Sequence, residues 1–151
     1  SSLPLPSLLG YDAGMSDAAF LGAIRAAPDD DTARLVYADY LDERGSPADV
    51  ARAEFIRVQV RLAGLTDAHP DRPALEDREN ELLRAHERAW VGEMSAPLAR
   101  GVVRWRFERG FLATAQVAAR TLSANGTALF AAHPVGRVRL TALDAAPDSS
   151  V

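Results

Sequence analysis

The sequence predicts an α+β fold, in which a cap of four helices precedes a small sheet. From Ser16 to Trp90, apolar residues recur at spacings of three and four, which is typical of helices packed on one side. From Val103 the spacing changes to two, which is typical of half-buried strands. The chain has 151 residues, 48% of them hydrophobic, so it is long enough to bury the core of one domain.

Residues that begin and end helices divide the first ninety positions. Pro28 stops a first helix, the aspartates at 29–31 favour the start of a second, and Gly45 ends it. Ser46 and Pro47 then suit the start of a third helix, and the polar loop 66–71 leads to a fourth. We therefore expect helices over 16–27, 31–45, 47–65 and 72–90.

The faces of these helices predict how they pack. The second helix is apolar around most of its circumference, so we expect it to be central. The third helix carries one apolar stripe, which should pack against the second: Ala51, Phe55, Val58, Leu62 and Leu65. Its polar residues are interpreted as a solvated, salt-bridged face: Arg52, Glu54, Arg57, Gln59 and Arg61.

The C-terminal part is expected to form three strands. The segments before and after Arg109-Gly110 should pair as an antiparallel hairpin with a tight turn. A short helix over 123–132 and a strand over 137–143 follow. The second and third strands are about 26 residues apart, which predicts a right-handed βαβ crossing with the period of a leucine-rich repeat.

Four units are expected along the chain. Residues 1–14 are an N-terminal extension or a foreign segment that folding does not require, or else a peptide that docks on the domain. Residues 15–92 form the helical unit, residues 93–144 form the small α/β unit, and residues 145–151 form a polar tail.

The run LVYADYLDERG at 35–45, followed by EFIRVQ at 54–59, resembles the bacterial repeat-companion domain, a module found ahead of leucine-rich-repeat-like segments. The resemblance covers roughly 16–65. The later RGF at 109–111 and LF, HPV and V.L over 129–140 are similar to the continuation of that family into its first repeat. The resemblance implies a helical cap on a repeat-like sheet and a non-catalytic interaction role.

The composition of the chain argues against several classes of function. A net charge of −4 argues against general attraction to nucleic acid or to anionic lipid, both of which favour a basic face. The absence of cysteine excludes disulfides and thiolate metal sites. No apolar run is long enough to span a membrane, so we expect a cytoplasmic protein.

No catalytic constellation is recognisable in the sequence. It contains no phosphate-binding loop, no calcium loop and no nucleophile elbow. His69, His86 and His133 lie on separate elements without metal-ligand spacing, and helix capping accounts for the aspartates at 29–31. We expect neither an enzyme nor a cofactor or metal site.

Strand alternation predicts a partner-binding face. One face of the sheet should be covered: Val103, Trp105, Phe107, Phe111, Ala113, Ala115, Val117, Val138 and Leu140. The other should be exposed, and we call it the arginine face: Arg104, Arg106, Glu108, Thr114, Gln116, Arg137, Arg139 and Thr141. Its four arginines favour an acidic protein or peptide as the partner. A solvated face neutralised by Glu108 and by nearby acidic helices is the alternative.

Two functional interpretations stay open at this point. The first is a non-catalytic module that binds a protein or peptide. The second is an accessory domain that presents a peptide substrate to a separate modifying enzyme. A neighbouring gene for such an enzyme, together with one for a small peptide, would favour the second.

Overall fold

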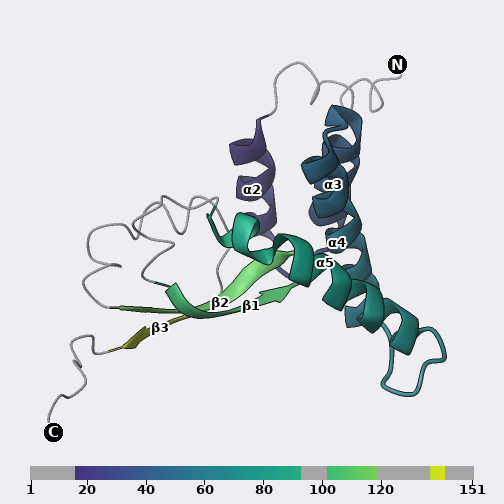
Figure 1. Ribbon diagram of the computed structural model, residues 1–151. Helices are drawn as coiled ribbons and strands as arrows, with labels where there is room; N and C mark the ends of the chain where they lie inside the picture. Colours follow the sequence, from purple (N-terminus) through teal and green to yellow (C-terminus); the bar gives the residue numbers. More distant parts are fainter. Residues whose placement is uncertain (1–15, 93–101, 119–136, 142–151) are drawn as a thin grey trace, which may run out of the picture.

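The computed structural model describes residues 16–92, 102–118 and 137–141 (Figure 1). The described helices are α2 (Asp17–Ala26), α3 (Thr32–Arg44), α4 (Pro47–Ala63) and α5 (Arg72–Gly92), and the strands are β1 (Val102–Glu108), β2 (Phe111–Ala118) and β3 (Arg137–Thr141). Four helices followed by an antiparallel hairpin confirm the α+β class. The expected segment 1–14, the helix over 123–132 and the tail 145–151 lie outside the described residues.

The helix ends follow the local chemistry of the sequence. The Ser16 and Ser46 hydroxyls each accept a hydrogen bond from a backbone N–H in the first turn of the next helix. Gly45 ends α3 in the left-handed conformation, with φ 75°. At the start of α3 the cap comes from Asp30, whose Oδ1 accepts from the Thr32 N–H at 2.9 Å. The expected boundaries hold within two residues.

The central helix is α4, and the expectation that the second helix is central was wrong. One side of α4 contributes Phe55, Val58 and Leu62 to a core shared with α5 and the sheet. Its other side contributes Ala53 and Ile56 to a second core, which it shares with α2, α3 and Phe111. In α3, by contrast, Leu35 is 38% exposed. Apolar residues all round a helix favour burial, but here α3 packs on one side only.

Three long polar side chains are buried, and two of them, Arg52 and Gln59, belong to the face of α4 that was expected to be solvated. Arg34, Arg52 and Gln59 are each less than a tenth exposed. Each is long enough to reach a backbone carbonyl: Arg34 donates to Pro28, Arg52 to Gly110 and Gln59 to Phe107. These hydrogen bonds offset the cost of removing the polar groups from water.

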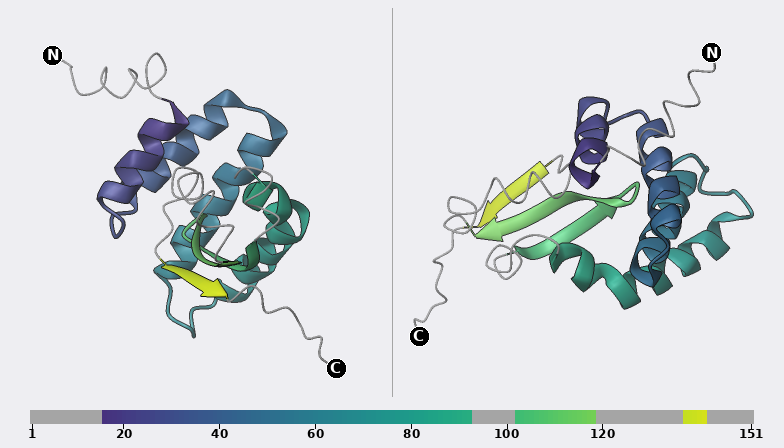
Figure 2. Two further views of the ribbon diagram at one scale, coloured as in Figure 1. Left: turned by 90° about the vertical axis from the view of Figure 1, so that its left-hand side faces the viewer. Right: turned by 90° about the horizontal axis from the view of Figure 1, so that it is seen from above.

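The hairpin turn lies against α4. From there the strands extend away from α3 and α4 and run alongside α5 (Figure 2). β1 and β2 pair antiparallel, with a two-residue turn at Arg109-Gly110 as expected. Strand order is β1-β2-β3, and β3 runs parallel to β2. β1 is therefore an edge strand of the described sheet.

A bulge in β2 changes which residues face the core. Arg106 pairs with Thr114, but Phe107 pairs with Leu112, so Ala113 is an extra residue on β2. Leu112 therefore lies in the core with α5, although strict alternation had placed it on the opposite face. Phe111 is buried too, but in the other core, with α2 and α3.

Candidate functional site

The strand register aligns most of the arginine face in two cross-strand rows. Arg104 lies opposite Gln116, which lies opposite Arg139. The second row is equally regular and joins Arg106, Thr114 and Arg137. The two remaining members lie at the margins: Glu108 pairs with Phe111 beside the turn, and Thr141 pairs with Ala118.

The arginines of β1 are accessible to a ligand. Arg104 and Arg106 are exposed, and Thr114 and Gln116 beside them are half-buried. The Arg106 side chain is 74% exposed, and its Nε lies 3.7 Å from Oε2 of Glu108, which is itself 54% exposed. An ion pair this open to water holds its partners weakly, so it leaves Arg106 available to a partner.

A groove between α4, α5 and the edge strand β1 was not foreseen. Its volume is about 570 Å³. Residues 105–109 line one side of it, and α5 supplies the opposite wall: Arg72, Glu76, Glu79, Leu83 and Glu87. These α5 positions recur at intervals of three and four, so the sequence alone already indicates that they share one face of the helix. The glutamates made that face resemble ordinary solvated surface.

Gln59 joins α4 to both walls of this groove. Its amide nitrogen donates to Glu79 Oε1 at 2.7 Å and to the Phe107 carbonyl at 3.3 Å. Its amide oxygen accepts from the Gly110 N–H at 2.6 Å. Further along the groove, the Trp105 indole N–H donates to Glu87 Oε2 at 2.8 Å. The groove walls are thus fixed by hydrogen bonds on both sides.

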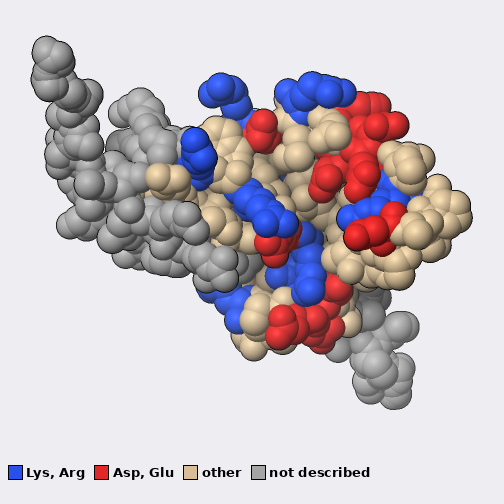
Figure 3. Space-filling model, turned by 90° about the horizontal axis from the view of Figure 1, so that it is seen from below, with Lys and Arg blue, Asp and Glu red and all other residues tan. Residues whose placement is uncertain are grey.

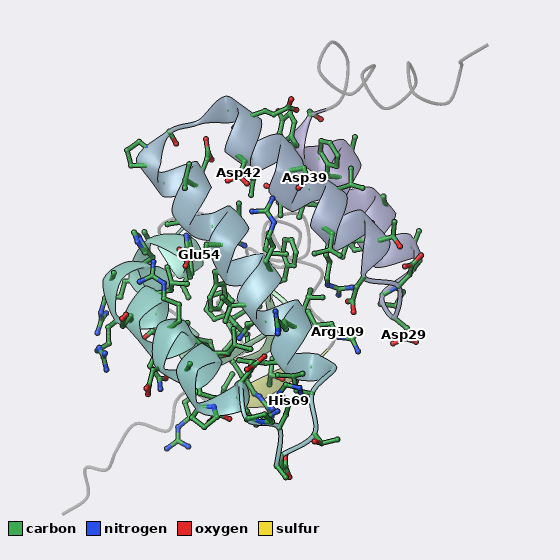
Figure 4. The ribbon with its side chains drawn as sticks, turned by 90° about the vertical axis from the view of Figure 1, so that its right-hand side faces the viewer. Asp29, Asp39, Asp42, Glu54, His69 and Arg109 are labelled. Atoms are coloured by element: carbon green, nitrogen blue, oxygen red, sulfur yellow. The ribbon has the colours of Figure 1, made fainter. Side chains whose placement is uncertain are left out.

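Elsewhere several acidic and basic side chains pair between helices, and the two signs lie next to each other on the face seen in Figure 3. Arg57 of α4 bonds Asp39 and Asp42 of α3, which lie together in Figure 4. Burial lowers the pKa of Arg57, but its bonds to both carboxylates outweigh that effect and raise the pKa. Glu54 and Arg57, one turn apart on α4, do not pair with each other in the described contacts, because their partners lie on α5 and α3.

Two further arginine–carboxylate pairs also connect different helices, and in each the arginine bonds both carboxylate oxygens. Arg78 of α5 bonds both oxygens of Glu54 at 2.6 and 2.7 Å, and these hydrogen bonds lower the pKa of the Glu54 carboxyl. Arg44 bonds both oxygens of Asp49 in the same way and lowers the pKa of that carboxyl. We interpret these charges as inter-helix contacts, since each carboxylate already has an arginine partner.

A second cavity of about 340 Å³ lies between the helices and the start of β2. At its edge the Arg52 guanidinium lies between two rings, 5.2 Å from the centre of Trp90 and 5.3 Å from that of Phe111. His86 stacks on Trp90 with ring centres 5.3 Å apart. Here the arginine has a packing role, and the histidine is half-buried in the same aromatic group.

Neither a metal-binding cluster nor a membrane span is found in the described ranges. Within them, no three His, Cys, Asp or Glu side chains are grouped so as to hold a metal ion. Their helices are also too polar or too short to cross a membrane. His69 uses Nδ1 to accept from the Asp71 N–H at 3.1 Å, and His133 lies outside the described residues.

Comparison with known proteins gives no further assignment. No protein-family model, curated protein or solved structure matches this chain.

Proposed function

We propose that this chain is a non-catalytic interaction module that binds an acidic segment of a protein or peptide on its arginine face. In this proposal, the helices shield one side of a repeat-like sheet and the other side receives the partner. The observation that carries the proposal is the pair of cross-strand rows, in which arginine positions flank Gln116 in one row and Thr114 in the other.

The spacing of these rows suits an extended acidic chain. Same-face residues of one strand are about 7 Å apart, and strands separated by one neighbour are about 10 Å apart. Alternate carboxylates along an extended peptide have the same repeat of about 7 Å. An arginine fork binds a carboxylate through two hydrogen bonds, so each row can hold one acidic side chain of the partner.

The charge of the rest of the chain favours a local, specific contact. With a net charge of −4, the chain as a whole repels an acidic partner, and the arginine face supplies a local attraction for it. Thr114 and Gln116 between the arginines add hydroxyl and amide groups that suit the partner backbone. We therefore expect binding that depends on salt and on the position of the acidic residues.

The test uses fluorescence anisotropy with a labelled decapeptide in which glutamate alternates with threonine. Arg104→Gln with Arg106→Gln should weaken binding at least tenfold, and adding Arg137→Gln and Arg139→Gln should weaken it further. Arg84→Gln with Arg88→Gln is the matched control, because both are exposed on α5 and the charge change is the same. Unchanged affinity in the fourfold variant, with an unchanged unfolding midpoint, would overturn the proposal.

A further inference from the structure

The groove between α5 and β1 has an uneven distribution of charge. Each arginine that lines it has an acidic partner: Arg72 with Glu76 at 2.9 Å, Arg106 with Glu108 at 3.7 Å and Arg109 with Asp31 at 3.5 Å. Two carboxylates of the lining, those of Glu79 and Glu87, have no arginine partner among the described residues. Glu79 accepts from the Gln59 amide and Glu87 from the Trp105 indole, and both of these donors are neutral.

These two glutamates have no ion-pair partner among the described residues, and the lining as a whole carries four glutamates against three arginines. Both are half-buried, so water screens them less than it screens a fully exposed carboxylate. A ligand with two positive charges would find partners that are already oriented by hydrogen bonds. The same site would repel an acidic ligand.

Apolar side chains and a strand edge complete the groove. Leu62 and Phe107 are buried in its floor, and Leu83 and Trp105 are half-buried beside them. The Phe107 carbonyl already accepts from Gln59, so backbone groups of β1 point into the groove. Trp105, two residues earlier, has its backbone groups on the same side of the strand. An edge strand with such groups can pair with an extended peptide.

The spacing of the carboxylates defines the ligand further. Glu79 and Glu87 are eight residues apart on α5, which corresponds to about 12 Å along the helix. In an extended peptide, side chains four residues apart lie on one face and are about 13 Å apart. We propose that this groove binds an extended peptide with basic side chains at two positions four residues apart. This site adjoins the arginine face, with which it shares Arg106 and Glu108, and selects the opposite charge.

The probe for this site is a labelled five-residue peptide with arginine at both ends and Val-Thr-Val between them, acetylated and amidated. Anisotropy should show saturable binding that weakens as salt is raised. Glu79→Gln with Glu87→Gln should weaken binding at least tenfold. Glutamine keeps an oxygen that accepts from Gln59 and from Trp105, so the walls of the groove stay in place while the charge is removed.

Two comparisons separate groove binding from general charge attraction. Asp77→Asn with Glu81→Gln removes the same charge from exposed positions of α5 outside the groove and should leave affinity within about twofold. A peptide with arginine at its first and third positions should bind more weakly, because its side chains are only about 7 Å apart. Saturable binding that is equal in the Glu79/Glu87 variant and in the wild type would overturn the proposal, as would no saturable binding at millimolar peptide.

The two proposed binding sites can be tested independently of each other. Arg104→Gln removes a charge from the arginine face at a position that does not line the groove, so it should leave binding of the basic peptide unchanged. Loss of basic-peptide binding in the Glu79/Glu87 variant, with acidic-peptide binding retained, would assign the two activities to separate surfaces.

Discussion

The backbone of Gly110 lies directly against Ile56 of α4. A Cβ atom at this position would come within 2.8 Å of the Ile56 Cα and would also overlap the Ile56 side chain. Gly110 has φ 89°, a conformation that residues with a Cβ rarely adopt. The hairpin therefore reaches the central helix through a glycine, and this contact places β1 beside the groove.

The first prediction tests this contact. Gly110→Ala should destabilise the fold by about 3 kcal/mol, because it adds both backbone strain and overlap with a buried helix. Gly45→Ala is the matched control: its φ is 75°, but a Cβ there would meet only carbonyl oxygens at 3.8 Å. That change should cost about 1 kcal/mol. Equal urea midpoints for the two variants would show that the turn is free to move away from α4.

The second prediction concerns Phe55, which is fully buried in the core formed with α5 and the sheet. Its ring centre lies 4.6 Å from that of Trp90 and 5.5 Å from that of Phe107. Phe55→Ala should cost about 3–5 kcal/mol through lost burial and a residual cavity. Leu35→Ala, at an exposed site on α3, should cost less than about 1 kcal/mol. A shift below about 1 kcal/mol for Phe55→Ala would contradict the packing of α4 described above.

The third prediction concerns Gln59, which connects α4 with the turn and with α5. Gln59→Leu should cost about 2–4 kcal/mol, because it removes the partner of the buried Gly110 N–H and one partner of the Phe107 carbonyl. Hydrogen exchange at the Gly110 amide is the specific readout and should become faster relative to amides in the middle of α4. If the variant exchanges there as slowly as the wild type, another group must protect this amide.

Local chemistry explains why the helix boundaries were predictable from the sequence. Serine caps, Pro47 and Gly45 act within one turn of their own positions, so no knowledge of distant partners was needed. Period-two alternation likewise predicted β1 and its tight turn. These are the features that neighbouring residues determine by themselves.

Features set by distant partners were not predictable in this way. The bulge at Ala113 depends on how two strands pair, and it puts Leu112 in the core with α5 and Phe111 in the core with α2 and α3. Gln59 looked solvated because its hydrogen-bond partners lie about twenty or more positions away in the sequence. The acidic wall of the groove was overlooked for a similar reason: a row of glutamates on a helix normally faces water.

The last prediction is a dependence of stability on pH that arises at Asp49. Hydrogen bonds from Arg44 lower the pKa of the Asp49 carboxyl below its ordinary value of 3.8. Between the lowered pKa and 3.8 the unfolded chain binds more protons than the folded chain, so stability rises with pH across this window. The contribution is complete above about pH 5 and is lost as the pH falls through the folded pKa.

Because the Arg44 side chain is 39% exposed, this contribution should be less than about 1 kcal/mol. Asp49→Asn should therefore lower the urea midpoint at pH 7, and the difference from the wild type should narrow at pH 3. Asp67→Asn, at an exposed site in the loop before α5, should behave as the wild type at both pH values. If the urea midpoint of Asp49→Asn is as far below that of the wild type at pH 3 as at pH 7, the charge of Asp49 contributes nothing to stability. The side chain would then stabilise the fold through its hydrogen bond with Ser46 and its position at the start of α4.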